Sequence, residues 1–69
     1  MNLRESANLN WCKLVRVTMT DGELQTGKLV GYTSALDNEP DPESITLEKE
    51  HGMLVELYVD EIAAVATEG

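Results

Sequence analysis

The stretch VRVTMTDGELQTGKLVGY, residues 15–32, constrains the fold more than any other part of the chain. Apolar and polar residues alternate from Val15 onward, which is the period of a strand with one buried face. An Asp-Gly pair at 21–22 interrupts the alternation, and glycine tolerates the positive φ that tight hairpin turns require. A second strand follows over residues 23–33. The stretch therefore predicts an antiparallel β-hairpin.

Two glycines, Gly27 and Gly31, lie inside the second strand of this hairpin. Interior glycines weaken a flat strand, but they let a strand bend sharply or let another backbone come close. We therefore predict a curved second strand, as in a small barrel. The alternative is a flat sheet that contains two incidental glycines.

The rest of the chain predicts three further strands. Residues 44–50 place Ile45 and Leu47 on one face. A tight turn at 50–52 leads into a strand over residues 53–59. A one-turn 3₁₀ reversal at 59–61 then precedes a last short strand that ends at residue 67.

Two segments lie outside this pattern. Residues 1–10 predict a short helix capped by Asn2, or else a frayed arm, because so short a helix must pack on something to be stable. Residues 34–43 predict an exposed loop, since Pro40 and Pro42 cannot donate to a ladder and the loop's carboxylates repel one another.

With 69 residues, the chain has room for a single domain over residues 1–69. We predict an all-β fold, a small, strongly bent, five-stranded antiparallel SH3-like barrel with a short N-terminal helix. A flat five-stranded meander is the alternative, but so few residues could not cover both of its faces. A domain of this size buries only about 60% of its unfolded surface, so oligomerisation is an economical source of further burial.

The net charge of −8, from 13 acidic and 5 basic residues, argues against binding to polyanions. Nucleic-acid affinity depends on clustered Lys and Arg, and here the basic residues are scattered along the sequence. We see no apolar run that could span a bilayer and no secretion signal, so no membrane partner is expected. The unpaired Cys12 fits a reducing compartment and predicts a cytoplasmic protein with a partly buried, inert thiol.

No residue pattern predicts catalysis, a cofactor or a metal site. His51 has no partner at a recognised ligand spacing, and no Ser or Thr lies in a nucleophile motif. The alternating carboxylates of the acidic loop lack the sharp glycine turn of a calcium loop. We therefore expect that the chain is not an enzyme.

The last two strands are unusually apolar, and Glu56 is the only charge within the MLVELYV segment. A strand that faces solvent on one side should alternate cleanly. We expect these strands at the edges of the sheet, where another chain would cover them; a fully buried monomeric arrangement is the alternative. The expected oligomer interface comprises Leu54, Leu57, Tyr58, Ile62, Ala64 and Val65.

The segment KLVRVTMTDGELQTGKLVGY, residues 13–32, resembles the first motif of the Sm/LSm family: alternating apolar residues, an Asp-Gly turn and G-x-Leu-x-Gly-aromatic. SITLE resembles the family's third strand, and GMLVELYVDEIAAV its fourth and fifth. The resemblance implies closed rings in which the fourth strand of one subunit pairs with the fifth of its neighbour. It also implies RNA binding around a central pore, with Tyr32, Asp37 and Asn38 as candidate RNA-binding residues.

Two departures from the family pattern decide which of two functional hypotheses we place first. Thr33 stands where the family has Asp after the aromatic residue, and Val59-Asp60 replaces the Arg-Gly of the second motif. The first hypothesis is therefore a non-enzymatic Sm-like module that forms a homo-oligomer, in its simplest form a ring, as an interaction scaffold. The alternative is an RNA-binding Sm-like protein with a variant nucleotide pocket.

Overall fold

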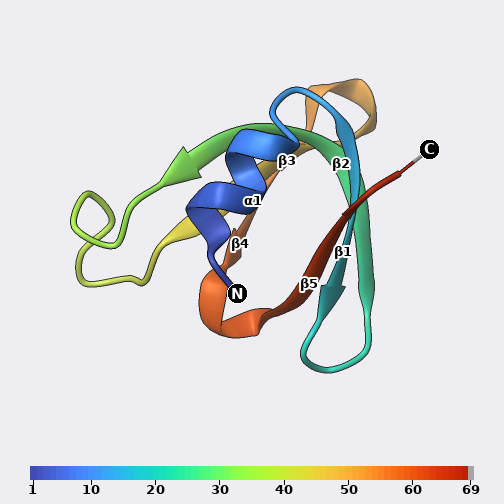
Figure 1. Ribbon diagram of the computed structural model, residues 1–69. Helices are drawn as coiled ribbons and strands as arrows, with labels where there is room; N and C mark the ends of the chain where they lie inside the picture. Colours follow the sequence, from blue (N-terminus) through green and yellow to red (C-terminus); the bar gives the residue numbers. More distant parts are fainter. Residues whose placement is uncertain (69) are drawn as a thin grey trace.

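The computed structural model describes residues 1–68, which form one five-stranded antiparallel sheet and one short helix (Figure 1). The strand order is β4-β3-β2-β1-β5. The elements are α1 (Leu3–Leu9), β1 (Leu14–Met19), β2 (Leu24–Thr33), β3 (Ser44–Glu48), η1 (Glu50–Gly52), β4 (Leu54–Tyr58), η2 (Val59–Glu61) and β5 (Ile62–Thr67). The predicted hairpin, the three later strands and the two connecting turns are confirmed.

The β1–β2 hairpin turns at Gly22, whose φ is +91°. The amide of Met19 donates to the carbonyl of Glu23 at 2.8 Å and closes the turn. On β1, Val15 and Val17 are fully buried, whereas Arg16 between them is exposed. The alternation in the sequence therefore predicted the correct inward face of this strand.

The long strand β2 curves across the molecule and pairs with β1 through its first part and with β3 through its second (Figure 1). Its pairing with β3 is irregular between Leu29 and Gly31. A Cβ on Gly31 would lie 3.1 Å from the Cβ of Thr46, so this part of β2 approaches β3 closely. The curved second strand that the interior glycines predicted is confirmed (Figure 1).

The core lies between the sheet and the helix. Its buried apolar residues come from α1 and from all five strands, and they are Leu3, Ala7, Val15, Val17, Leu29, Ile45, Leu47, Leu57 and Ile62. Through Leu3 and Ala7, α1 covers part of β2 and β3 (Figure 1). The helix therefore contributes to the core and is not a frayed arm.

Both ends of α1 are fixed by asparagine side chains. The amide of Glu5 donates to Oδ1 of Asn2 at 3.0 Å, which confirms the predicted N-cap. At the other end, Nδ2 of Asn10 donates to the carbonyl of Ser6 at 2.9 Å. Oδ1 of Asn10 accepts a hydrogen bond from the hydroxyl of Thr67, which connects the end of the helix to the end of β5.

Two local expectations are wrong. Cys12 is exposed rather than partly buried, because it lies with φ +61° in the link between α1 and β1. This link is held by its backbone, since the amide of Cys12 donates to the carbonyl of Leu29 at 2.9 Å. In the acidic loop, Asp37, Glu39 and Asp41 are exposed as expected, but Glu43 is half-buried.

Candidate functional site

The two outer strands of the sheet, β4 and β5, lie at its edges, as expected from the sequence. Within residues 1–68, β4 pairs only with β3, and β5 pairs only with β1. Each therefore presents a row of backbone donors and acceptors without a partner strand. Such edges are templates for pairing with another chain.

The hydrogen-bond register shows which backbone groups face outward on β5. The amide of Glu68 donates to the carbonyl of Leu14 at 2.8 Å, so the backbone N–H of Glu68 faces β1. Alternate residues of an antiparallel strand point to the same side. The backbone N–H and C=O groups of Ala64 and Ala66 therefore also face β1. Those of Val65 and Thr67 face the free edge.

The hydrogen bonds of β4 show in the same way which of its backbone groups face outward. The amide of Lys49 donates to the carbonyl of Met53 at 2.7 Å, and that of Val59 donates to Glu43 at 2.9 Å. Odd-numbered residues of β4 therefore bond to β3. The free edge of β4 carries the N–H and C=O groups of Leu54, Glu56 and Tyr58.

The side chains of the expected interface residues divide into three groups by exposure. Leu57 and Ile62 are buried in the core of the single chain. Leu54 is 62% exposed and Ala64 is exposed, while Tyr58 and Val65 are half-buried. Because Leu54 is exposed, β4 is not buried on both faces in the single chain. The fully buried monomeric arrangement is therefore wrong.

Among the candidate RNA-binding residues, Tyr32 at the end of β2 already has two close neighbours. Its hydroxyl donates to the carboxylate of Glu43. The guanidinium carbon of Arg4 lies 5.6 Å from the centre of its ring. The bond to Glu43 and partial desolvation raise the pKa of Tyr32 above its ordinary value, although Arg4 opposes this shift.

Asn38 belongs to a different cluster, centred on the carboxylate of Glu56. Nδ2 of Asn38 donates to the carbonyl of Pro42 at 2.9 Å and lies 3.4 Å from Oε2 of Glu56. Ser44 donates to the same oxygen at 2.6 Å, and the hydroxyl of Tyr58 donates to Oε1 at 3.0 Å. These bonds, with that of Ser44 the largest contribution, lower the pKa of Glu56. The bond to Glu56 in turn raises the pKa of Tyr58.

The third candidate, Asp37, is exposed, and its backbone amide donates to Oγ of Ser34 at 3.2 Å. No hydrogen bond within residues 1–68 joins Tyr32 to Asp37 or Asn38. Glu43 and Glu56 were not predicted from the sequence as partners of the candidate residues. The single charge in an apolar strand was the signal that could have indicated Glu56.

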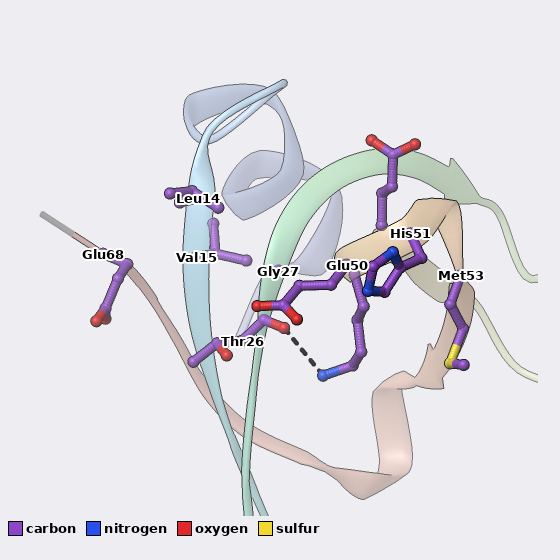
Figure 2. Close-up of a pocket in the computed structure, with 10 residues that line it drawn as sticks. Leu14, Val15, Thr26, Gly27, Glu50, His51, Met53 and Glu68 are labelled. Atoms are coloured by element: carbon purple, nitrogen blue, oxygen red, sulfur yellow. Dashed lines mark hydrogen bonds between the residues drawn. The ribbon is translucent and has the colours of Figure 1, made fainter.

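A groove of about 780 Å³ lies between the start of β1, the bend of β2 and the β3–β4 turn (Figure 2). Figure 2 shows Leu14 and Glu68 on one side, His51 and Met53 on the other, and Thr26 and Gly27 between them. This groove was not predicted from the sequence. The signal was the consecutive pair Leu14–Val15, which places an apolar residue on each face of β1.

Residues 1–68 contain no cluster of three or more His, Cys, Asp or Glu side chains that could hold a metal ion. No helix in this part of the chain is long and apolar enough to cross a membrane. The chain matches no protein-family model, no curated protein and no solved structure. The features of residues 1–68 that bear on function are the two sheet edges, the two carboxylate clusters and the groove.

Proposed function

We propose that this chain is a non-enzymatic, cytoplasmic Sm-like module whose bent sheet forms an SH3-like barrel and whose copies assemble into a homo-oligomeric ring. In this proposal the free edge of β4 in one copy pairs with the free edge of β5 in the next. The assembled module acts as an interaction scaffold.

The observation that carries the proposal is the presence of two free edges on one small sheet. The edge of β4 offers the backbone groups of Leu54, Glu56 and Tyr58, and that of β5 offers those of Val65 and Thr67. The side chains beside them are mostly apolar or small, with Leu54 and Ala64 exposed. Small side chains on β5 leave its backbone accessible to a partner strand.

The difference between the two edges supports a ring. A contact between two different surfaces of identical copies is heterologous, so each copy keeps one free edge for a further copy. Such head-to-tail contacts end only when the last copy meets the first, or they continue as a filament. The small core of a 69-residue chain also favours assembly, because edge pairing adds burial.

Light scattering coupled to gel filtration tests this proposal directly. At micromolar concentration we expect one species that contains several copies of the 7.6-kDa chain. A monomer of 7.6 kDa at that concentration would contradict the proposal.

RNA binding by the same module is the alternative, and the arrangement of Arg4 and Tyr32 favours it. An arginine over a half-buried aromatic ring is a pair that can contact a base and a phosphate. The carboxylates of Glu43 and Glu56, which accept bonds from Tyr32 and Ser44, oppose an anionic ligand at the same place.

Titration with oligo-U and oligo-A at low and physiological salt separates the two functions. Binding that survives physiological salt and is lost in Tyr32→Ala would favour the RNA-binding alternative. Electrostatic, sequence-independent binding weakens steeply with salt. Affinity seen only at low salt would therefore not favour the RNA-binding alternative.

A further inference from the structure

The groove in Figure 2 has an apolar surface that nothing within residues 1–68 covers. Leu14 on one side is 60% exposed and Met53 on the other is 63% exposed. Its volume of about 780 Å³ lies in the range of about 300–1,000 Å³ that is common for ligand sites. Methionine side chains adapt to differently shaped apolar ligands. The groove is thus large enough for a few apolar side chains.

The charges that line the groove are predominantly negative. Glu48, Glu50 and Glu68 contribute carboxylates, and Lys49 contributes the one ammonium group. Nζ of Lys49 donates to the carbonyl of Thr26 at 2.9 Å, as the dashed line in Figure 2 shows, so this cation is held against the backbone. Glu68 pairs with Arg16 at 2.9 Å, whereas Glu48 and Glu50 form no ion pair within residues 1–68.

Lys28 is the cross-strand partner of Glu48 in the β2–β3 register, but no ion pair joins them within residues 1–68. An apolar surface beside two carboxylates without an ion pair is complementary to an apolar ligand that carries positive charge. The net charge of −8 adds a long-range attraction for the same ligand and repels nucleic acids. Within this chain, apolar residues and positive charge occur together at residues 1–4, 13–16 and 28–30. Leu3 of the first stretch is buried in the core, and the other two stretches belong mostly to the inner strands β1 and β2. A second copy therefore has no free segment of this kind to offer.

We propose that the groove between Leu14 and Met53 binds a short segment of another protein in which apolar residues alternate with Lys or Arg. The apolar side chains of the segment occupy the groove, and its cationic groups meet Glu48 and Glu50. This inference goes beyond the proposed ring, because the groove forms within one chain and includes neither free strand edge.

The probe is an acetylated and amidated peptide of sequence Arg-Leu-Lys-Leu-Arg, titrated into ¹⁵N-labelled protein. We expect a Kd below about 1 mM at physiological salt, with amide shifts that concentrate at Leu14, Gly27, His51 and Met53. Two matched peptides separate the contributions: Arg-Ser-Lys-Ser-Arg keeps the charge, and Glu-Leu-Glu-Leu-Glu keeps the apolar residues. Both should bind at least about tenfold more weakly.

A pair of double variants with the same charge change locates the site. Glu48→Lys with Glu50→Lys should weaken binding of the probe about tenfold. Glu39→Lys with Asp41→Lys, on the exposed acidic loop, should change it less than about twofold, because those charges are screened at a distance. Leu14→Ser, at an exposed position, tests the apolar contribution without a change of charge and should also weaken binding.

Three results would overturn the inference: equal binding of the serine peptide, shifts that concentrate in residues 34–43, or equal loss in the two double variants. Each would mean that the peptide responds to the acidic surface in general. Light scattering on the parent protein keeps this result separate from assembly. A parent protein that is monomeric and still binds the probe in the groove would contradict the ring and support the groove.

Discussion

Gly27 of β2 lies directly against the backbone of Glu48 at the end of β3. A Cβ placed on Gly27 would lie 3.0 Å from the carbonyl oxygen of Glu48 and 3.1 Å from the Cβ of Leu47. β3 cannot retreat easily, because it is hydrogen-bonded to β2 on one side and to β4 on the other. The close approach of these two strands therefore depends on a residue without a side chain.

The first prediction follows from this contact. Gly27→Ala should lower the free energy of unfolding by about 1–3 kcal/mol, because it inserts a methyl group where the backbone is already in contact. Chemical denaturation followed by circular dichroism measures the change. The neighbouring Thr26→Ala, at an exposed position, should stay within about 0.5 kcal/mol of the parent. Equal stability of Gly27→Ala and the parent would mean that β3 can move away.

The second prediction concerns assembly through β5. Val65→Pro removes an N–H that faces the free edge, so the fold should persist while the oligomer dissociates to monomer. Ala64→Pro removes an N–H that faces β1, so it should destabilise the fold itself. Light scattering reports the mass, and circular dichroism reports the fold. A folded Val65→Pro variant that keeps the parent's oligomeric mass would exclude pairing through this edge.

The buried position of Leu57 makes it unsuitable for the same test. Its side chain is only 5% exposed, so Leu57→Asp should unfold the chain whether or not β4 forms an interface.

The third prediction concerns the start of α1. Asn2→Ala removes the acceptor of the Glu5 amide and should cost about 1 kcal/mol of stability. Asn8→Ala makes the same chemical change at an exposed position inside the helix, where alanine is the better helix former. It should leave stability equal or slightly higher. If both variants lost the same stability, the cap would not be the cause.

The fourth prediction is a pH dependence at Glu56, whose pKa is lowered from its usual 4.5 by the bonds from Ser44 and Tyr58. Because the carboxylate is favoured in the folded state, its contribution to stability is complete above pH 4.5. It disappears as the pH falls through the lower folded pKa. Urea midpoints between pH 7 and 3 should therefore fall less steeply in Glu56→Gln than in the parent.

A matched control for this experiment is Glu50→Gln, which removes an exposed carboxylate from the β3–β4 turn. Its urea midpoints should follow the parent across the same pH range. An unchanged acid dependence in Glu56→Gln would show that the hydrogen bonds to Glu56 do not contribute to the stability of the folded state.

The fifth prediction uses the tyrosines at the opposite end of the pH range. The pKa values of Tyr32 and Tyr58 are raised by their bonds to Glu43 and Glu56, respectively. A raised folded pKa means that this stabilisation is complete below the unfolded value of 10.0 and is lost as the pH rises through the folded value. Tyr32→Phe with Tyr58→Phe should therefore lose less stability above pH 10 than the parent, as measured by urea midpoints.

The strands and their inward faces were predictable because they depend on local pattern. Alternation placed Val15 and Val17 on the core side, and Asp21–Gly22 located the hairpin turn. The last two strands also lie at the edges of the sheet, as expected for the five-stranded fold predicted from the sequence. These properties follow from the two-residue period of a strand and the positive φ that glycine tolerates.

Tertiary structure alone decided which polar side chains meet. Glu43 and Tyr32 are 11 residues apart in sequence, and Ser44 and Glu56 are 12 apart, yet each pair is hydrogen-bonded. It also placed Leu14 opposite Met53 across the groove (Figure 2) and gave Tyr32 and Asn38 different hydrogen-bond partners. Periodicity fixes the face on which a side chain lies, but the bend of β2 and the path of the loop determine its neighbours. The bend and the loop path depend on packing between segments that are distant in the sequence.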